Sequence, residues 1–143
     1  MVKSGLKQEI LENKEPARVS QYRLAAHLGS AFALYLGLLN TGLRILLPPA
    51  KAAPMGTHMR KLKFLATGAS HLILTTAIAG AFVAGLDAGM IYNTFPKMGN
   101  TFIPSDIWVE KYGWKNPFEN PTTAQFMHRC LVQAIFYNCS IFP

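Results

Sequence analysis

The sequence predicts an all-α fold, a polytopic transmembrane helical bundle. Half of its 143 residues are apolar and only 15% are charged, which is less charge than a soluble domain usually carries. The apolar residues are also continuous. A helix crosses a hydrocarbon core about 30 Å thick with about 20 mostly apolar residues, and three stretches reach or approach that length. We expect spans at residues 24–47, 64–90 and 126–143, the last of which ends before a full span is complete.

The segments around these spans are polar, basic and aromatic in turn. Residues 1–23 form a polar lead-in with alternating charge, which Pro16 breaks before the first span. Residues 48–63 form a basic loop, so that the first two spans make an antiparallel hairpin. Residues 91–125 form an aromatic loop that we expect along the membrane surface, where Trp and Tyr concentrate. Its four prolines disfavour a long helix there.

Membrane topology explains the net charge of +7 better than nucleic-acid binding does. The basic residues flank the apolar stretches and do not alternate with aromatics on a soluble scaffold. The loop 48–63 has four basic residues and no acidic one, whereas the loop 91–125 mixes both signs. The positive-inside rule therefore places the first loop inside. In a mitochondrial inner membrane that side is the matrix, and the aromatic loop then faces the intermembrane space.

Four histidines occupy different positions relative to the membrane. His27 and His128 each lie about one turn inside a span on the outer side, so they share a depth. Imidazoles on facing helices commonly hold a haem axially, but an interhelical hydrogen bond, a proton path and a quinone site are alternatives. His71 lies within the second span, where a hydrogen bond to a neighbouring helix suffices. His58 is expected to be a solvated loop residue.

An arginine accompanies each of the two outer histidines. Arg23 lies one turn before His27 on the same helix face, and Arg129 directly follows His128. Arginines pair with propionate groups of haem. They also anchor the ends of spans at headgroups, which explains both positions equally well.

Three further features lie in or beside the spans. Gly85 and Gly89 have the small-residue spacing that lets helices approach closely. Asp87 is expected at a helix end or as a residue that orders the following loop. Cys130 and Cys139 are nine positions apart and are expected to be ordinary buried thiols.

Four segments together resemble the haem A synthase family, in its mitochondrial branch. They are RVSQYRLAAHLGSA (18–31), GAFVAGLDAGMIYNTFPKMG (80–99), IPSD (103–106) and FENPTTAQFMHR (118–129). Their order and spacing extend the resemblance over nearly all of residues 1–129. The string GLDAG-x-x-YNTFP is far more specific than a single histidine.

The resemblance implies an eight-span inner-membrane enzyme with two pseudo-symmetric four-helix halves. Such an enzyme converts haem O to haem A for cytochrome c oxidase assembly by oxidising a porphyrin methyl to a formyl group. Each half holds one haem between histidines on even-numbered spans, and the three spans here resemble the fourth, fifth and sixth. His27 and His128 then correspond to the two iron ligands of the matching spans, one in each half, with Arg23 and Arg129 beside them. His58 and His71 match no ligand position, and no catalytic residue is assigned.

The resemblance also implies cofactors and partners. Haem b is the expected cofactor and haem O the substrate. The expected partners are membrane lipid, a ferredoxin-type electron-donor protein, and a second copy of the chain or a haem O synthase, with no nucleic acid.

By this resemblance neither haem site is complete, because the partner histidines belong to spans outside these 143 residues. The sequence departs from the family pattern after Arg129. We therefore expect a truncated form that does not synthesise haem A by itself. The main alternative is a non-enzymatic membrane segment that associates with other inner-membrane proteins. A proton- or quinone-handling transporter segment ranks last, since no acidic residue lies in mid-span.

Overall fold

A computed structural model describes residues 19–47 and 56–140, and within these ranges the chain is helical without a β-strand. The predicted all-α fold is thereby confirmed. The long helices are α3 (Gln21–Leu46), α4 (Thr57–Gly85) and α6 (Pro121–Ser140). The connection from α4 to α6 contains 3-10 turns at Ala88–Met90 and Glu110–Lys115 and the short helix α5 (Asn116–Glu119).

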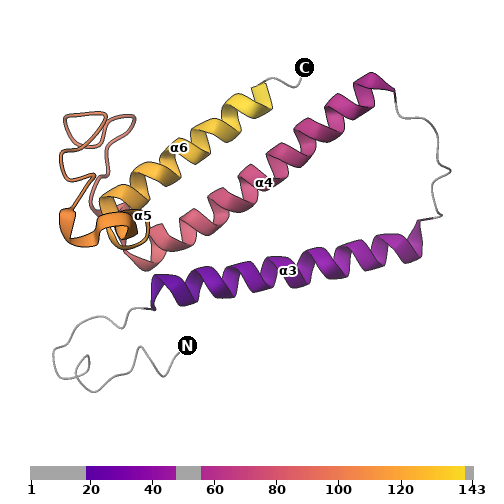
Figure 1. The fold of residues 1–143 in the computed structure, drawn as a ribbon, viewed down its shortest axis with the longest axis horizontal. Coiled ribbons are helices and arrows are strands. Elements are labelled where there is room, and N and C mark those ends of the chain that lie inside the picture. Colours follow the sequence, from indigo (N-terminus) through magenta and orange to yellow (C-terminus); the bar gives the residue numbers. More distant parts are fainter. Residues whose placement is uncertain (1–18, 48–55, 141–143) are drawn as a thin grey trace.

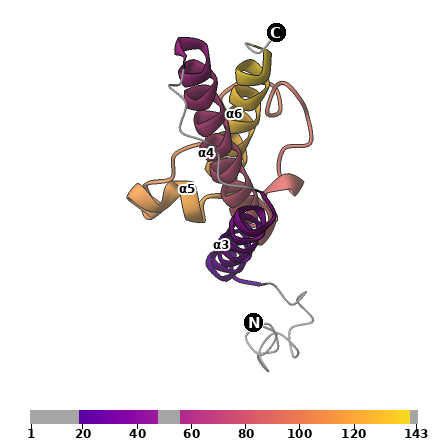
Figure 2. The same cartoon turned by 90° about the vertical axis from the view of Figure 1, so that its right-hand side faces the viewer.

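Helix α4 lies between α3 and α6 (Figure 1). Both neighbours pack on α4, and α3 diverges from it away from the end that carries α5 (Figure 1), whereas α3 and α6 contact each other marginally at most. In the view turned by 90°, α6 again lies beside α4, and α3 lies below both (Figure 2). The beginnings of α3 and α6 and the end of α4 lie together at the end of the molecule that carries α5. This end contains the residues considered below.

The helices begin before the apolar stretches expected as spans. Helix α4 starts at Thr57, so the last part of the expected basic loop, from residue 57 to 63, is helical, while residues 48–55 lie outside the described ranges. Helix α6 starts at Pro121, five residues before Phe126. Proline is favoured in the first turn of a helix, and the Asn120 side chain accepts the Thr122 N–H at 3.0 Å as a cap. The start of α6 therefore follows capping chemistry and not hydropathy, whereas the N-caps of α3 and α4 make no side-chain hydrogen bond.

Helix α4 ends earlier than its apolar stretch. It stops at Gly85, and Asp87 follows in the left-handed region with φ of 50°. This conformation ends a helix, and among non-glycine residues Asp is one of those that tolerate it best. Asp87 thus lies at the helix end, in one of the two positions expected for it.

Two described helices, α3 and α4, are long and apolar enough to cross a membrane. Only 6% and 11% of their apolar windows are buried within the chain. A core helix of a soluble protein would be mostly covered by its own chain, so these helices have the exposure of membrane helices. Helix α6 begins with a polar turn and does not meet the same criterion, so the third span stays a prediction.

Gly85, at the end of α4, and Gly89, just after it, differ in how closely another helix approaches them. A Cβ atom at position 85 would lie 2.5 Å from the Cα atom of Gln21, where α3 begins. A Cβ atom at position 89 would have no atom within 4 Å. Close approach therefore depends on Gly85 but not on Gly89, which lies in the 3-10 turn after the helix has ended.

Candidate functional site

His128 lies on the face of α6 that packs against α4. A Cβ atom at position 80 would lie 3.2 Å from its Cε1 atom, and 3.7 and 3.8 Å from its Nδ1 and Nε2 atoms. The Nδ1 atom is buried and has no hydrogen-bond partner among the described residues. Leaving a buried polar atom unpaired costs about 1–3 kcal/mol. The ring is thus packed closely against α4, and its Nδ1 atom lacks a hydrogen bond within the described residues.

His27 faces away from α4. Ala25 and Gly29, four residues apart, form the contact with α4: Ala25 is buried, and a Cβ atom at position 29 would lie 3.6 Å from the Cδ1 atom of Ile78. At about 100° per residue, His27 is about 200° around the helix from Ala25. Its side chain is exposed. The imidazole is therefore open to a ligand on the far side of α3.

The structure keeps the two histidines at a common depth without bringing them together. His27 is the seventh residue of α3 and His128 the eighth of α6, which places them about 9 and 10 Å along helices that begin at the same end. Helix α4 lies between their helices. Each histidine therefore has its own surroundings.

The two arginines differ in what they contact. Arg23 is exposed on α3, on the same face as His27. The Arg129 guanidinium donates from Nη1 to the carbonyl of Thr94 at 2.8 Å and from Nη2 to that of Tyr92 at 2.8 Å, with a longer bond of 3.3 Å to Lys97. A guanidinium has five N–H donors, so two remain for another acceptor. Arg129 is primarily an anchor for the loop before α6.

Asp106 is the centre of a polar network that sequence reasoning missed. Its carboxylate accepts hydrogen bonds from the Tyr92 and Thr122 hydroxyls, both at 2.7 Å, and its carbonyl accepts one from Asn120 at 2.9 Å. The Gln125 amide also donates to the carbonyl of Tyr92 at 2.8 Å. Together these bonds fix the loop to the first turns of α6. We call this network the loop clamp, formed by Tyr92, Asp106, Asn120, Thr122, Gln125 and Arg129.

The hydrogen bonds of the loop clamp shift the pKa values of Asp106 and Tyr92. Burial acts to raise the pKa of the Asp106 carboxyl, but the hydrogen bonds from Thr122 and Tyr92 outweigh it and hold that pKa below its usual value. The hydrogen bond to Asp106 in turn raises the pKa of the Tyr92 hydroxyl. The network therefore favours an ionised aspartate and a neutral tyrosine.

The same loop contacts the beginning of α3. The Tyr22 hydroxyl donates to the Glu119 carboxylate at 3.0 Å, and the Tyr22 ring packs edge-on against Phe82 with centroids 5.7 Å apart. Phe82 also meets Phe118 at 5.2 Å. One loop thus contacts both helices that carry an outer histidine.

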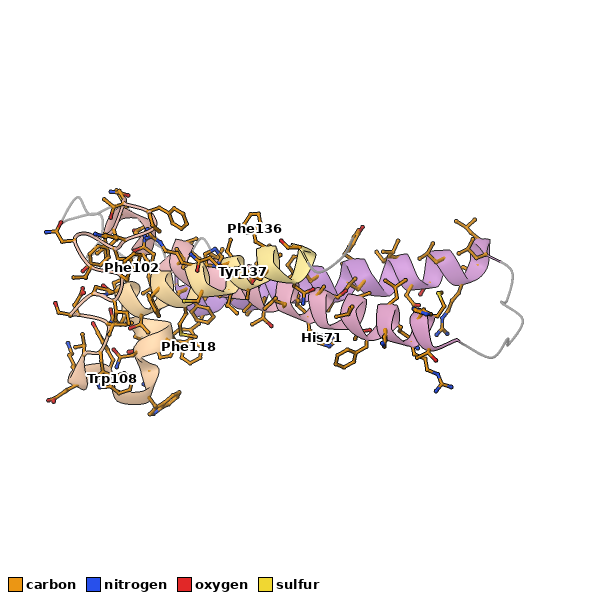
Figure 3. The ribbon with its side chains drawn as sticks, turned by 90° about the horizontal axis from the view of Figure 1, so that it is seen from above. His71, Phe102, Trp108, Phe118, Phe136 and Tyr137 are labelled. Atoms are coloured by element: carbon orange, nitrogen blue, oxygen red, sulfur yellow. The ribbon has the colours of Figure 1, made fainter. Side chains whose placement is uncertain are left out.

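Aromatic side chains project from this end of the molecule. Figure 3 shows Phe102, Trp108 and Phe118 gathered beside the start of α6. Phe102 and Trp108 are exposed, as is Trp114. Such side chains are typical of the membrane interface.

The other two histidines differ from expectation. His71 bonds the carbonyl of Thr67 in its own helix at 2.8 Å, not a neighbouring helix, and lines an apolar cavity of about 370 Å³ with Phe32 and Leu36. His58 lies in the first turn of α4, not in a loop, because the helix begins at Thr57. It is exposed, as expected.

The cysteines and acidic residues offer no alternative metal centre within the described ranges. Cys130 is a free thiol and is exposed, although we expected it to be buried. The side chain of Cys139 is not among those that the structure describes. No group of three His, Cys, Asp or Glu residues in the described part of the chain is placed to hold a metal ion. His27 and His128 remain candidate haem ligands, because a helix can present a single imidazole to a haem iron.

Comparison with known proteins gives one consistent result. The COX15-CtaA family model, described as cytochrome oxidase assembly protein, matches residues 1–142. The chain is 53% identical over 131 residues to "Heme A synthase COX15" of Homo sapiens and 43% identical over 132 residues to "Heme A synthase" of Paracoccus denitrificans. It is 38% identical over 169 residues to the "Heme A synthase-mitochondrial ferredoxin fusion protein" of Schizosaccharomyces pombe.

These similarities cover most of this chain but a minor part of each relative. They include 92%, 90% and 99% of the chain and 32%, 32% and 27% of the human, Paracoccus and fission yeast proteins, respectively. The chain therefore spans about a third of the length of the curated relatives it matches. No solved structure matches it.

Proposed function

The chain belongs to the COX15-CtaA family of cytochrome oxidase assembly proteins, and we propose that it is part of a haem A synthase in which His27 and His128 are axial ligands of two different haem groups. The observation that carries this proposal is the position of α4 between α3 and α6. Because His128 packs against α4 and His27 faces away from it, each imidazole is directed to separate surroundings. When bound, haem supplies the redox-active iron, and the chain supplies one nitrogen ligand to each group.

The proposed reaction is the conversion of haem O to haem A, in which a porphyrin methyl is oxidised to a formyl group for cytochrome c oxidase assembly. The names of the relatives support it. Haem b is then the resident cofactor and haem O the substrate. Arg23, exposed one turn before His27, would pair with a propionate. Arg129 would do so with the two N–H donors that the loop carbonyls do not occupy.

The proposed location is the mitochondrial inner membrane, crossed several times. The end of the α3–α4 hairpin carries Arg44, Arg60, Lys61 and Lys63 with no acidic residue between positions 16 and 86, which favours the matrix side for it. A ferredoxin-type protein is the proposed electron donor. The fission yeast relative supports this, because its name describes a fusion of haem A synthase with a mitochondrial ferredoxin. Lipid, a second copy or a haem O synthase would cover the exposed apolar faces of α3 and α4.

The proposal is tested in the complete reading frame that contains these residues. His27→Ala and His128→Ala are compared with His58→Ala, which changes an exposed histidine at the opposite end of α4. We expect each of the first two variants to lose the haem of one site, measured as haem per protein, and to lose haem A synthesis. The His58→Ala protein should retain both. Unchanged haem content and activity in both ligand variants would reject the assignment.

The 143-residue chain by itself is expected to synthesise no haem A, because it offers one imidazole where each haem requires two. Its purified form in detergent should therefore fail to give the absorption spectrum of a haem with two histidine ligands. If the ligand variants of the complete protein also keep their haem, the chain is better explained as a membrane segment that associates with other inner-membrane proteins.

A further inference from the structure

We propose that Gly80 is a positioning residue that provides the space for the imidazole of His128 and thereby sets the orientation of that ring. The inference rests on the proposed role of His128 as a haem ligand and adds a residue to its site. Gly80 lies on α4, not on the helix that carries the ligand. The three atoms nearest to a Cβ atom built at position 80 all belong to the His128 ring.

A glycine in the middle of a helix needs a reason. Glycine destabilises a helix interior relative to alanine, and Gly80 lies five residues before the end of α4. Its backbone is not in the left-handed region, unlike those of Gly99 and Gly113. Conformation therefore does not require glycine at position 80, and the close approach of the His128 ring is the reason that remains.

The available space is less than a methyl group needs. A Cβ atom at position 80 would lie 3.2 Å from Cε1 of His128, and ordinary contacts begin at 3.4 Å. The ring would have to move by a few tenths of an ångström. Whether a methyl group is tolerated therefore depends on whether His128 can withdraw.

The loop clamp opposes that withdrawal. Arg129, the next residue, bonds the carbonyls of Tyr92, Thr94 and Lys97. Gln125, one turn earlier and buried, bonds the carbonyl of Tyr92 as well. Both lie within about 100° of His128 around α6, so they restrain rotation of the helix as well as its displacement. A methyl group at position 80 should then turn the imidazole ring and leave the helix in place.

The ring orientation can be measured. In a low-spin ferric haem with two imidazole ligands, the angle between the two ring planes determines the g-values of the electron paramagnetic resonance spectrum. We compare Gly80→Ala with Gly68→Ala in the complete protein. Both substitutions lie in α4, but a Cβ atom at position 68 would have no atom within 4 Å. We expect shifted g-values for one haem in Gly80→Ala, or loss of that haem from correctly folded protein, and an unchanged spectrum in Gly68→Ala.

A Gly80→Ala protein with the unchanged spectrum and haem content of the wild type overturns the inference. If Gly80→Ala does not accumulate, the double variant Gly80→Ala/His128→Ala is compared with His128→Ala. Accumulation of both to the same level identifies the His128 ring as the cause and supports the inference, whereas failure of the double variant alone overturns it. The proposed function fails separately, when His128→Ala keeps its haem.

Discussion

Replacement of Gly85 by alanine tests how closely α3 and α4 pack. A Cβ atom at this position would lie 2.5 Å from the Cα atom of Gln21, 2.6 Å from its Cβ atom and 3.0 Å from its nitrogen. Ordinary contacts begin at 3.4 Å, so the beginning of α3 must withdraw by about 1 Å, the difference between 3.4 and 2.5 Å. No flexible side-chain end can absorb this change, because two of the three atoms belong to the backbone.

The cost follows from two opposing contributions. Forcing an extra methyl group into a packed interface costs about 1–3 kcal/mol, and the rigid backbone contact places Gly85→Ala in the upper part of this range. The helix propensity of alanine returns up to about 1 kcal/mol, and less than that at the last residue of a helix. The net loss should be about 1–3 kcal/mol. In Gly68→Ala only the favourable contribution applies, so that variant should be as stable as the wild type or up to about 1 kcal/mol more stable.

The assay is thermal unfolding of the complete protein in detergent, followed by the loss of helical circular dichroism. Gly85→Ala should unfold at a lower temperature than the wild type, and Gly68→Ala at the same temperature or a higher one. If Gly85→Ala is as stable as Gly68→Ala, the close packing of α3 on α4 at Gln21 is refuted.

Three further predictions concern the loop clamp and the histidines. Arg129→Lys keeps the charge but loses the paired donors, so it should cost about 1–3 kcal/mol and speed proteolysis of the loop; an unchanged cleavage rate would contradict the anchoring role. The lowered pKa of Asp106 contributes stability that is lost as the pH falls below about 4. The raised pKa of Tyr92 contributes stability that is lost as the pH rises above about 10. Proteolysis of the loop should therefore be faster at both pH limits, and Asp106→Asn should remove the increase at acidic pH. The double variant His27→Ala/His128→Ala should lose the sum of the two single haem losses, and a loss no larger than that of one single variant would indicate a shared site.

The sequence predicts the helices well and their ends poorly. Continuous apolar stretches identify α3, α4 and most of α6, because burial in hydrocarbon requires such continuity. The ends depend on single residues. Asn120 caps α6 and Pro121 starts it, while Asp87 follows the end of α4 in a left-handed conformation. None of these positions stands out in hydropathy.

The candidate site is only partly predictable for a similar reason. His27 and His128 stand out because imidazoles are rare in apolar spans. The partners of His128 do not stand out, since they depend on which helix faces meet. Gly80 looks no different from Gly89 in the sequence, yet only Gly80 contacts a candidate ligand. Asp106 lies in a polar loop where hydrophobic periodicity gives no signal, although it falls within one of the strings that carry the family resemblance.

Two positions of α4 explain why the histidines do not form one pair. Ile78 contacts α3 at Gly29, and Gly80 contacts α6 at His128. Two residues correspond to about 200° around a helix, so α3 and α6 pack on nearly opposite faces of α4. Packed helices have axes about 8–10 Å apart, which places the axes of α3 and α6 about 16–20 Å apart with α4 between them. A single haem held by both imidazoles would have to pass through α4, so any haem bound at each must be completed by a second ligand from elsewhere.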